Sequence, residues 1–225
     1  MIHGAGASSA IWMMVLARLG RVTRAVAIDL PGHGPSPQGD GGALSIERYR
    51  DASGLLAAAL CLGPSLLVGH SMGALVAVEA ALAWPDKVTG LVLCGAAPRL
   101  PVSDELLRVV RDDYARFPAW IAERALSPGT KAAVRRGFVA AGTAAARETT
   151  LADYESVAAA DLSSRLGELR CPIVWLDGAD DRVVAPVAGR PGEIVTLAGV
   201  GHLTPIEAPA VVAEAAARLL RVSAD

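Results

Sequence analysis

The 225-residue chain is poor in aromatic residues and in cysteine. Aromatic residues make up 4% of it and hydrophobic residues 52%, which indicates helices with small side chains packed on a sheet rich in valine and leucine. The three cysteines, Cys61, Cys94 and Cys171, include no Cys-x-x-Cys pair, and no histidine stands at metal-ligand spacing from them. We interpret them as buried thiols, and we expect no metal or other cofactor.

Neither an excess of one charge nor a long apolar run is present. The formal net charge is −2 and the lysines and arginines are scattered, which argues against a nucleic-acid partner. No apolar run reaches the ~18 residues that cross a bilayer, and no signal-peptide pattern opens the sequence. We therefore expect a cytoplasmic protein without a membrane span. Neither GxGxxG nor GxxxxGKS/T occurs, which excludes the common phosphate-binding loops.

Short apolar runs alternate with longer stretches of helical periodicity. The apolar runs cover residues 26–28, 65–69, 88–94, 172–176 and 193–197, and the helical stretches cover residues 10–19, 46–62, 72–84 and 209–221. Continuous hydrophobicity is typical of strands that are buried on both faces of a parallel sheet. This order predicts an α/β fold with a doubly wound, mainly parallel sheet and helices on both faces.

Residues 99–169 break this order, because they show helical periodicity without a convincing strand. They predict a helical lid, or cap, inserted into a core made of residues 1–98 and 170–225. We expect the lid to cover the carboxyl edge of the sheet. The side chains that we expect to line the pocket include Leu107, Val110, Trp120 and Tyr154.

The strongest chemical signal is the pentapeptide Gly-His-Ser-Met-Gly at residues 69–73. It follows an apolar run and precedes a helical stretch, the context in which a GxSxG motif forms a sharp strand-to-helix turn. Glycines on both sides let the backbones pass closely, and the turn exposes the hydroxyl of Ser71 at the carboxyl edge of the sheet. A serine that only capped a helix would not need both glycines, so we predict that Ser71 is a nucleophile.

A serine hydroxyl needs a base, and the chain has four histidines. His70 lies inside the turn, where we expect its side chain to point away from the hydroxyl. His3 begins a glycine-rich turn, and His33 follows a strand, where a structural hydrogen bond is the simpler interpretation. His202 lies on a loop after the last apolar run and before a terminal helix, where the chain order serine, acid, histidine puts the base.

The acid must lie between the nucleophile and the base in the chain. The segment after the apolar run at residues 172–176 offers three aspartates. Asp177 should still belong to the strand, which leaves Asp180 and Asp181 as candidates for the carboxylate that accepts the imidazole N–H.

An oxyanion hole needs backbone N–H donors close to the nucleophile. The residue after the nucleophile, Met72, supplies one at the start of its helix. The loop of residues 3–6, His-Gly-Ala-Gly, offers another through the N–H of Ala5. The alternative for this glycine-rich stretch is a disordered terminus.

These segments together resemble the α/β-hydrolase fold family. The resemblance rests on residues 2–6, Trp12, residues 29–36 (Asp-Leu-Pro-Gly-His-Gly-Pro-Ser), residues 69–73, residues 178–181 (Gly-Ala-Asp-Asp) and residues 201–202 (Gly-His). It covers the chain outside the expected lid and is closest to small carboxylesterases, haloperoxidase-like perhydrolases and carbon–carbon bond hydrolases. There the acid stands three residues after the strand-end glycine and shortly before a proline. Gly178 and Pro186 match, which implies Asp181 rather than Asp180 as the acid.

The chain departs from the family at two places. The family begins with a β-hairpin and a third strand that lies between the fourth and fifth strands, whereas only Met1 and Ile2 precede His3. We therefore expect the N-terminal hairpin and most of the third strand to be missing, with an interior gap of unpaired backbone groups. A version extended upstream by about two dozen residues should be more stable and more active. The stretch between Asp181 and His202 is short, so the crossover helix there should be reduced to a turn.

The resemblance implies a carboxylic ester hydrolase that forms an acyl-serine on a small-molecule ester, without a cofactor. Ser71 attacks, His202 takes its proton, Asp181 orients the imidazole, and the N–H groups of Ala5 and Met72 hold the oxyanion. The same triad could instead serve perhydrolysis, lactone opening or carbon–carbon bond hydrolysis, because the pocket decides between them. A catalytically weak relative that only binds a small ligand is the alternative from another class, and the intact Ser/Asp/His set argues against it.

Overall fold

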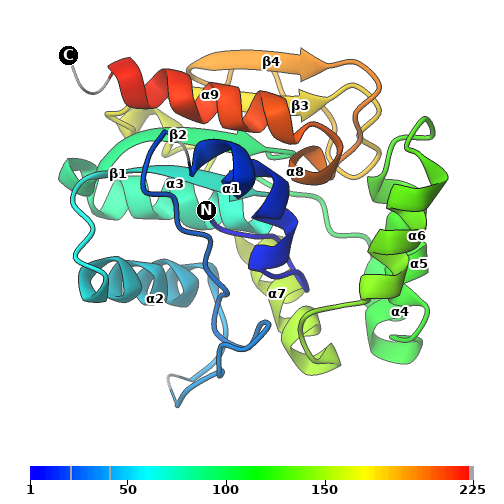
Figure 1. Cartoon of the computed structure of the whole chain (residues 1–225). Helices are drawn as coiled ribbons and strands as arrows, with labels where there is room; N and C mark the ends of the chain where they lie inside the picture. The colour runs from blue at the N-terminus through cyan, green and yellow to red at the C-terminus, as the bar shows by residue number, and fades with distance from the viewer. Residues whose placement is uncertain (21, 41, 223–225) are drawn as a thin grey trace.

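The computed structural model describes residues 1–20, 22–40 and 42–222 of the chain. Four parallel strands form a sheet in the order β1-β2-β3-β4: β1 (Ser65–His70), β2 (Val88–Cys94), β3 (Ile173–Gly178) and β4 (Glu193–Leu197) (Figure 1). Four of the five predicted strands are therefore confirmed. The apolar run at residues 26–28 forms no strand and contributes only a single bridge, from Ile28 to Ile2.

Residues 1 and 2 lie between the segment of residues 26–28 and β1. The N–H of Ile2 donates to the carbonyl of Val68 over 2.8 Å, and the carbonyl of Ile2 accepts the N–H of His70 over 3.0 Å. On the other side, the carbonyl of Met1 accepts the N–H of Ile28 over 3.1 Å. We expected an interior gap with unpaired backbone groups here. Instead, Met1 and Ile2 join the segment of residues 26–28 to β1 through these hydrogen bonds.

Helices cover both faces of the sheet, as the alternating pattern predicted (Figure 1). One face carries α3, with α2 packed outside it, and the other face carries α9 and α1. Their bounds are α1 (Met13–Leu19), α2 (Ile46–Ala59), α3 (Met72–Ala83) and α9 (Pro209–Val222).

The central strand β2 explains why its sequence is a continuous apolar run. Successive side chains of a strand point to opposite faces of the sheet. Leu91 and Leu93 are fully buried in the cluster that includes α3, while Val92 and Cys94 are fully buried in the cluster that includes α9. Both faces exclude water, so every position of the strand favours an apolar residue.

Between β2 and β3 the chain forms four α-helices and a short 3-10 helix at Leu166–Glu168. The α-helices are α4 (Asp104–Asp112), α5 (Phe117–Ala125), α6 (Ala132–Ala141) and α7 (Arg147–Ala159). Every residue from 99 to 169 is described, and none of them belongs to a strand. Helices α4, α5 and α6 stand as a column beside the carboxyl ends of the strands (Figure 1). The short α8 (Thr204–Glu207) follows β4 and precedes α9.

The cysteines correct one expectation. Cys61 is exposed in the turn after α2, at a φ of 51°, so the interpretation of all three cysteines as buried thiols is wrong for this residue. Cys171 is half-buried and Cys94 is buried. Burial raises the pKa of the Cys94 thiol, and the nearby Asp177 raises it further.

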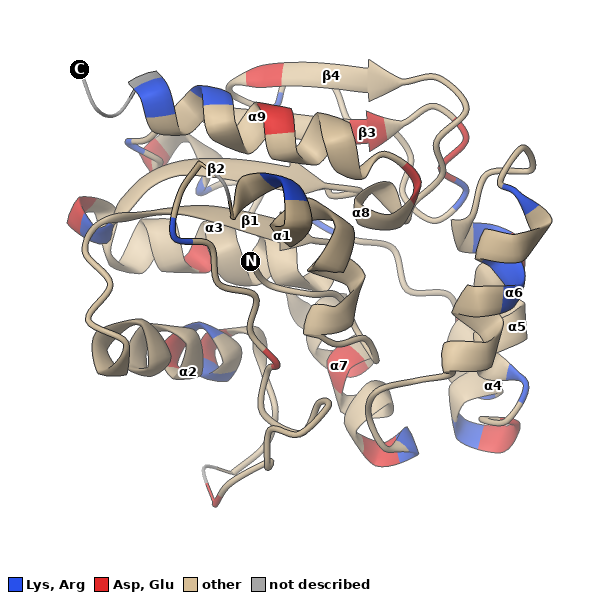
Figure 2. Ribbon diagram, in the orientation of Figure 1, with Lys and Arg blue, Asp and Glu red and all other residues tan. Residues whose placement is uncertain are grey.

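The connection from β3 to β4 has the form that the sequence predicted. No residue from 182 to 192 lies in a helix, so the crossover there consists of turns. Charges of both signs are interspersed on the surface: α2, α4 and α9 each carry arginine together with Asp or Glu (Figure 2). The longest described helices, α2 and α9, have 14 residues each. No helix of the described chain combines the length and the hydrophobicity needed to cross a membrane.

Candidate active site

Ser71 is the single residue between the end of β1 and the start of α3. Its φ of 52° and ψ of −119° lie in a region that residues with a side chain rarely occupy. The turn is fixed by two backbone hydrogen bonds, from the N–H of Ser71 to the carbonyl of Cys94 over 3.0 Å and from the N–H of Ala74 to the carbonyl of Ser71 over 2.9 Å. The motif therefore folds into the strained strand-to-helix turn that the sequence predicted.

The two glycines of the motif are required by the crossing of backbones at this turn. A Cβ at position 69 would lie 2.4 Å from the carbonyl oxygen of Gly73. A Cβ at position 73 would lie 2.3 Å from the carbonyl oxygen of Ile2. Both separations are far inside van der Waals contact, so neither Gly69 nor Gly73 can carry a side chain without moving the backbone around Ser71.

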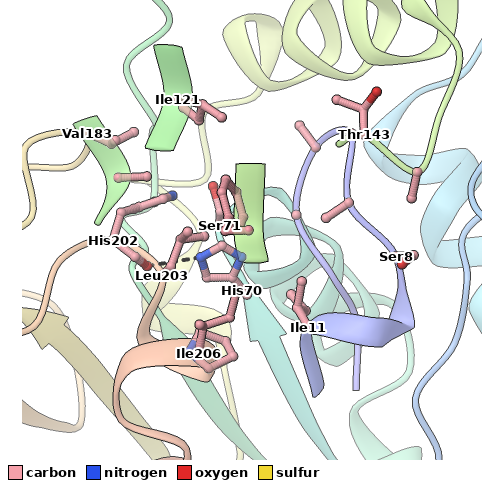
Figure 3. A pocket seen from close by; sticks show the side chains of 18 of the residues that line it. Ser8, Ile11, His70, Ser71, Ile121, Thr143, Val183, His202, Leu203 and Ile206 are labelled. Atoms are coloured by element: carbon pink, nitrogen blue, oxygen red, sulfur yellow. Dashed lines mark hydrogen bonds between the residues drawn. The ribbon is translucent and has the colours of Figure 1, made fainter. Parts of the chain in front are cut away.

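His202 lies on the loop after β4, at the same cavity as Ser71 (Figure 3). Its Nδ1 donates to Oδ2 of Asp181 over 2.9 Å, which leaves Nε2 as the unprotonated nitrogen of the neutral ring. The residue beside this ring is Gly95, and a Cβ on it would lie only 3.0 Å from Nδ1 of His202. A side chain at this position would therefore press against the imidazole. No hydrogen bond joins the Ser71 hydroxyl to the imidazole in the described chain, and such contacts often tighten only when substrate binds.

Asp181 is held as an ionised acceptor. Its Oδ1 accepts the N–H groups of Val183 and Val184 over 2.8 and 2.9 Å, while Oδ2 faces His202. Burial raises the pKa of this carboxyl, but the hydrogen bond and charge of His202 and the two backbone N–H groups outweigh it, so the pKa lies below its ordinary 3.8. Asp180 turns elsewhere and accepts the hydroxyl of Ser127 over 2.6 Å.

His70 packs beside this pair and is held neutral. Its Nε2 donates to the carbonyl of His202 over 3.0 Å, shown as a dashed line in Figure 3. Burial, with a smaller contribution from the neighbouring His202, lowers the pKa of His70 to about 3. Its Nδ1 is buried and has no partner among the described residues. The neutral ring supports the carbonyl of the His202 loop without adding a charge.

Two backbone N–H groups close to Ser71 in the structure are without a partner among the described residues. The N–H groups of Ala5 and Met72 make no hydrogen bond within the described part of the chain. Ala5 lines the same cavity as Ser71, and the preceding Gly4 packs so closely that a Cβ on it would lie 3.2 Å from the Cβ of Ser71. The structure thus brings both predicted donor residues to the nucleophile.

Sequence reasoning missed two carboxylates that support these loops. Glu207 on α8 accepts the N–H of Gly201 over 3.0 Å, the N–H of Ser127 over 2.9 Å and the hydroxyl of Thr130. It therefore ties the His202 loop to the segment after α5. Asp153 on α7 accepts the N–H of Gly6 over 2.9 Å. Neither residue stands in a recognisable motif, and their partners lie on other segments of the chain.

The cavity at Ser71 has a volume of about 450 Å³ and walls without formal charge. Among its described lining residues, the ionisable side chains are His70, His202 and Tyr154. Its apolar walls include Ile11, Met14, Leu106, Phe117, Ile121, Phe138, Val183 and Ile206. The described residues contain no group of three or more His, Cys, Asp or Glu side chains that could hold a metal ion.

The expected lining residues are only partly correct. Tyr154 lines the cavity, but Val110, Trp120 and Leu107 do not. They pack in the cluster formed by α4, α5 and α7, behind the residues of that cluster that line the cavity. Leu106 lines the cavity in place of its neighbour. Successive residues of a helix point about 100° apart around its axis. Helical periodicity therefore does not show which side of a lid helix faces the cavity, because that depends on where the neighbouring elements lie.

The fold and this site define the class of protein. The model of the alpha/beta hydrolase family matches residues 1–215, and the chain belongs to this family.

Particular members of the family are similar over most of the chain. A pimeloyl-[acyl-carrier protein] methyl ester esterase from Methylococcus capsulatus is 32% identical over 204 residues, covering 82% of this chain and 76% of that protein. One from Neisseria meningitidis serogroup A is 28% identical over 207 residues, covering 84% of this chain but 64% of that protein, which is less than two thirds of its length. The solved structure of a thermophilic esterase from Thermogutta terrifontis superposes with a TM-score of 0.85 at 28% identity, covering 99% of this chain and 88% of the other.

The two aspartates give a matched test of the site. Asp181→Asn should lower kcat by about three to four orders of magnitude. The amide oxygen would face the N–H groups of Val183 and Val184, and the NH₂ group would face Nδ1 of His202, which favours the tautomer with its proton on Nε2. Asp180→Asn should change kcat by less than about tenfold, since its partner is the Ser127 hydroxyl. Steady-state hydrolysis of p-nitrophenyl butyrate measures both. A larger loss for Asp180→Asn would show that Asp181 is not the acid.

Proposed function

We propose that this protein is a serine hydrolase that cleaves small, uncharged carboxylic esters through an acyl-enzyme intermediate. The observation that carries the proposal is the arrangement at one cavity of Ser71 on a strained turn and His202 with its Nδ1 hydrogen-bonded to Asp181. The names of the two curated relatives and of the Thermogutta structure, all esterases, support ester cleavage.

The chemistry follows from the positions of these atoms. As the Oγ of Ser71 bonds to the ester carbonyl carbon, Nε2 of His202 takes the hydroxyl proton, and Asp181 stabilises the imidazolium. The carbonyl oxygen becomes an oxyanion that accepts the N–H groups of Ala5 and Met72. The C–O bond to the alcohol then breaks, and the alcohol leaves with the proton from His202. A water molecule, deprotonated by the same nitrogen, repeats the sequence on the acyl-serine and releases the acid.

The walls of the cavity define the substrate class. A carboxylate or ammonium group that entered this cavity would lose its hydration and find no opposite charge on the described lining residues. The volume of about 450 Å³ lies within the usual range for small-molecule sites. Acyl and alcohol groups that are apolar and uncharged therefore fit best.

Residues 99–169 form the lid of this site in our proposal. Leu106, Phe117, Ile121 and Tyr154 of this segment line the cavity, facing the loops that carry Ser71 and His202. They would set the length and width of the acyl or alcohol group, while the core residues carry the chemistry.

Removing the nucleophile and the base tests the reaction type. Ser71→Ala and His202→Ala should each lower turnover of p-nitrophenyl esters by several orders of magnitude. The double variant should lose little more, because members of a triad act as a unit. A fluorophosphonate should label the wild-type protein and leave the Ser71→Ala variant unlabelled. Additive losses, or labelling of the variant, would contradict the proposed roles.

The pH profile tests which group acts as the base. Only the neutral imidazole of His202 can accept the proton, so kcat/KM should rise as the pH increases from 5 to 8. Asp181 does not contribute to this rise, because its pKa lies below the ordinary 3.8 and it stays ionised over the whole range. Initial rates in buffers of constant ionic strength measure the profile. A flat profile over this range would mean that another group serves as the base.

A matched pair of substrates tests the apolar walls. Mono-p-nitrophenyl glutarate carries a carboxylate at the end of its acyl chain, and its methyl-capped diester places an uncharged group there. The capped ester should have a kcat/KM at least about tenfold higher, which corresponds to about 1.4 kcal/mol. Equal values for the two esters would show that a charged acyl chain is accepted.

A further inference from the structure

Asp153 on α7 is a buried carboxylate that the proposed reaction does not use. Its side chain is fully excluded from solvent. Three donors surround it: the N–H of Gly6 at 2.9 Å, Nε2 of His33 at 2.8 Å and the hydroxyl of Tyr49. These donors come from three separate segments of the core, and all three bonds are long-range in the sequence.

His33 completes this cluster. Its Nε2 faces the Asp153 carboxylate, and its Nδ1 lies 3.1 Å from the carbonyl oxygen of Pro31. Each ring nitrogen therefore faces an acceptor oxygen. The ring of His3 is tilted against that of His33, with the centroids 4.8 Å apart, and its Nε2 accepts the N–H of Leu30. Burial, with a smaller contribution from the neighbouring His33, lowers the pKa of His3 to about 4.

Gly6 is held from both sides by the segment that includes Asp153. Its N–H donates to Asp153, and its carbonyl accepts the N–H of Ala144 over 3.0 Å. Its φ of 63° is left-handed, and a Cβ on it would lie 3.1 Å from the methyl group of Thr150. The Gly6 N–H belongs to the peptide group between Ala5 and Gly6, which is therefore fixed against α7. The N–H of Ala5 belongs to the peptide group just before it.

We infer that Asp153 is a positioning residue, which holds the loop of residues 4–6 so that the N–H of Ala5 stays aimed at the oxyanion. The inference rests on the proposed function, in which Ser71 forms an acyl-enzyme. A catalytic donor must be held to within roughly half an ångström of its position. A glycine-rich loop is flexible by itself, so it needs contacts from other segments to fix its conformation. The hydrogen bonds of Asp153 to His33 and Gly6 supply that restraint. Helix α7 is thus part of the catalytic machinery as well as a wall of the cavity.

The test separates positioning from stability with a matched control. Asp153→Ala removes a buried, hydrogen-bonded carboxylate that contacts the loop. Glu79→Ala removes another buried carboxylate, which pairs with Arg165 over 2.8 Å and Arg50 over 3.5 Å and does not line the cavity. Both variants should melt at a lower temperature than the wild type. Only Asp153→Ala should lower kcat for p-nitrophenyl butyrate, by about 10- to 10³-fold with KM changed less than about threefold.

A transition-state analogue gives a second readout. Phenylboronic acid forms a tetrahedral adduct on a serine and places an oxygen in the oxyanion hole, so its Ki should rise in parallel with the loss of kcat. Asp153→Asn keeps the shape of the side chain but replaces one acceptor oxygen by an NH₂ group. It should retain more activity than Asp153→Ala while still losing about tenfold in kcat.

The outcomes are distinct. A wild-type kcat and Ki in Asp153→Asn, or equal kcat for folded Asp153→Ala and Glu79→Ala, would overturn the positioning role. A wild-type protein with no esterase activity and no fluorophosphonate labelling at Ser71 would instead overturn the proposed function itself.

Discussion

Three backbone segments cross within contact distance at Ser71, and the geometry of the site depends on that crossing. The end of β1, the first turn of α3 and residues 2–3 approach so closely that a Cβ at Gly69 or Gly73 would lie less than 2.5 Å from a carbonyl oxygen. Such an approach forces a positive φ on Ser71 and presents its side chain at the carboxyl edge of the sheet. The loops that carry the base, the acid and the backbone donors are useful only because they converge on this one point.

The helical segment between β2 and β3 restrains those loops. The N–H of His202 donates to the carbonyl of Ala125 at the end of α5 over 2.7 Å, and Glu207 ties the same loop to Ser127 and Thr130. On the other side of the cavity, α7 holds Gly6 through Asp153. Replacing this segment as a block would therefore change the support of the site together with its walls, whereas single substitutions on its cavity face change the walls alone.

Several features of the fold could be predicted because they depend on local patterns. The apolar runs predicted a parallel sheet, since strands buried on both faces, as β2 and β3 are, need apolar residues at nearly every position. The run of β4 also forms a strand, although this edge strand is largely exposed. The face of each lid helix could not be predicted in the same way. Leu106 rather than Leu107 lines the cavity, and Val110 and Trp120 pack between helices, because the neighbours that decide which face is buried lie elsewhere in the chain.

By itself the sequence determined the class of fold, the strained turn at Ser71 and the short set of candidates around it, because glycine spacing and strand order act over a few residues. Only the tertiary structure showed that His202 meets Asp181 while Asp180 turns to Ser127, that the cavity walls carry no formal charge, and that Asp153 reaches a glycine 147 residues away. The physical reason is that a buried polar group takes whichever partner the folded chain places within hydrogen-bonding distance, and that distance is set by the packing of whole helices on the sheet.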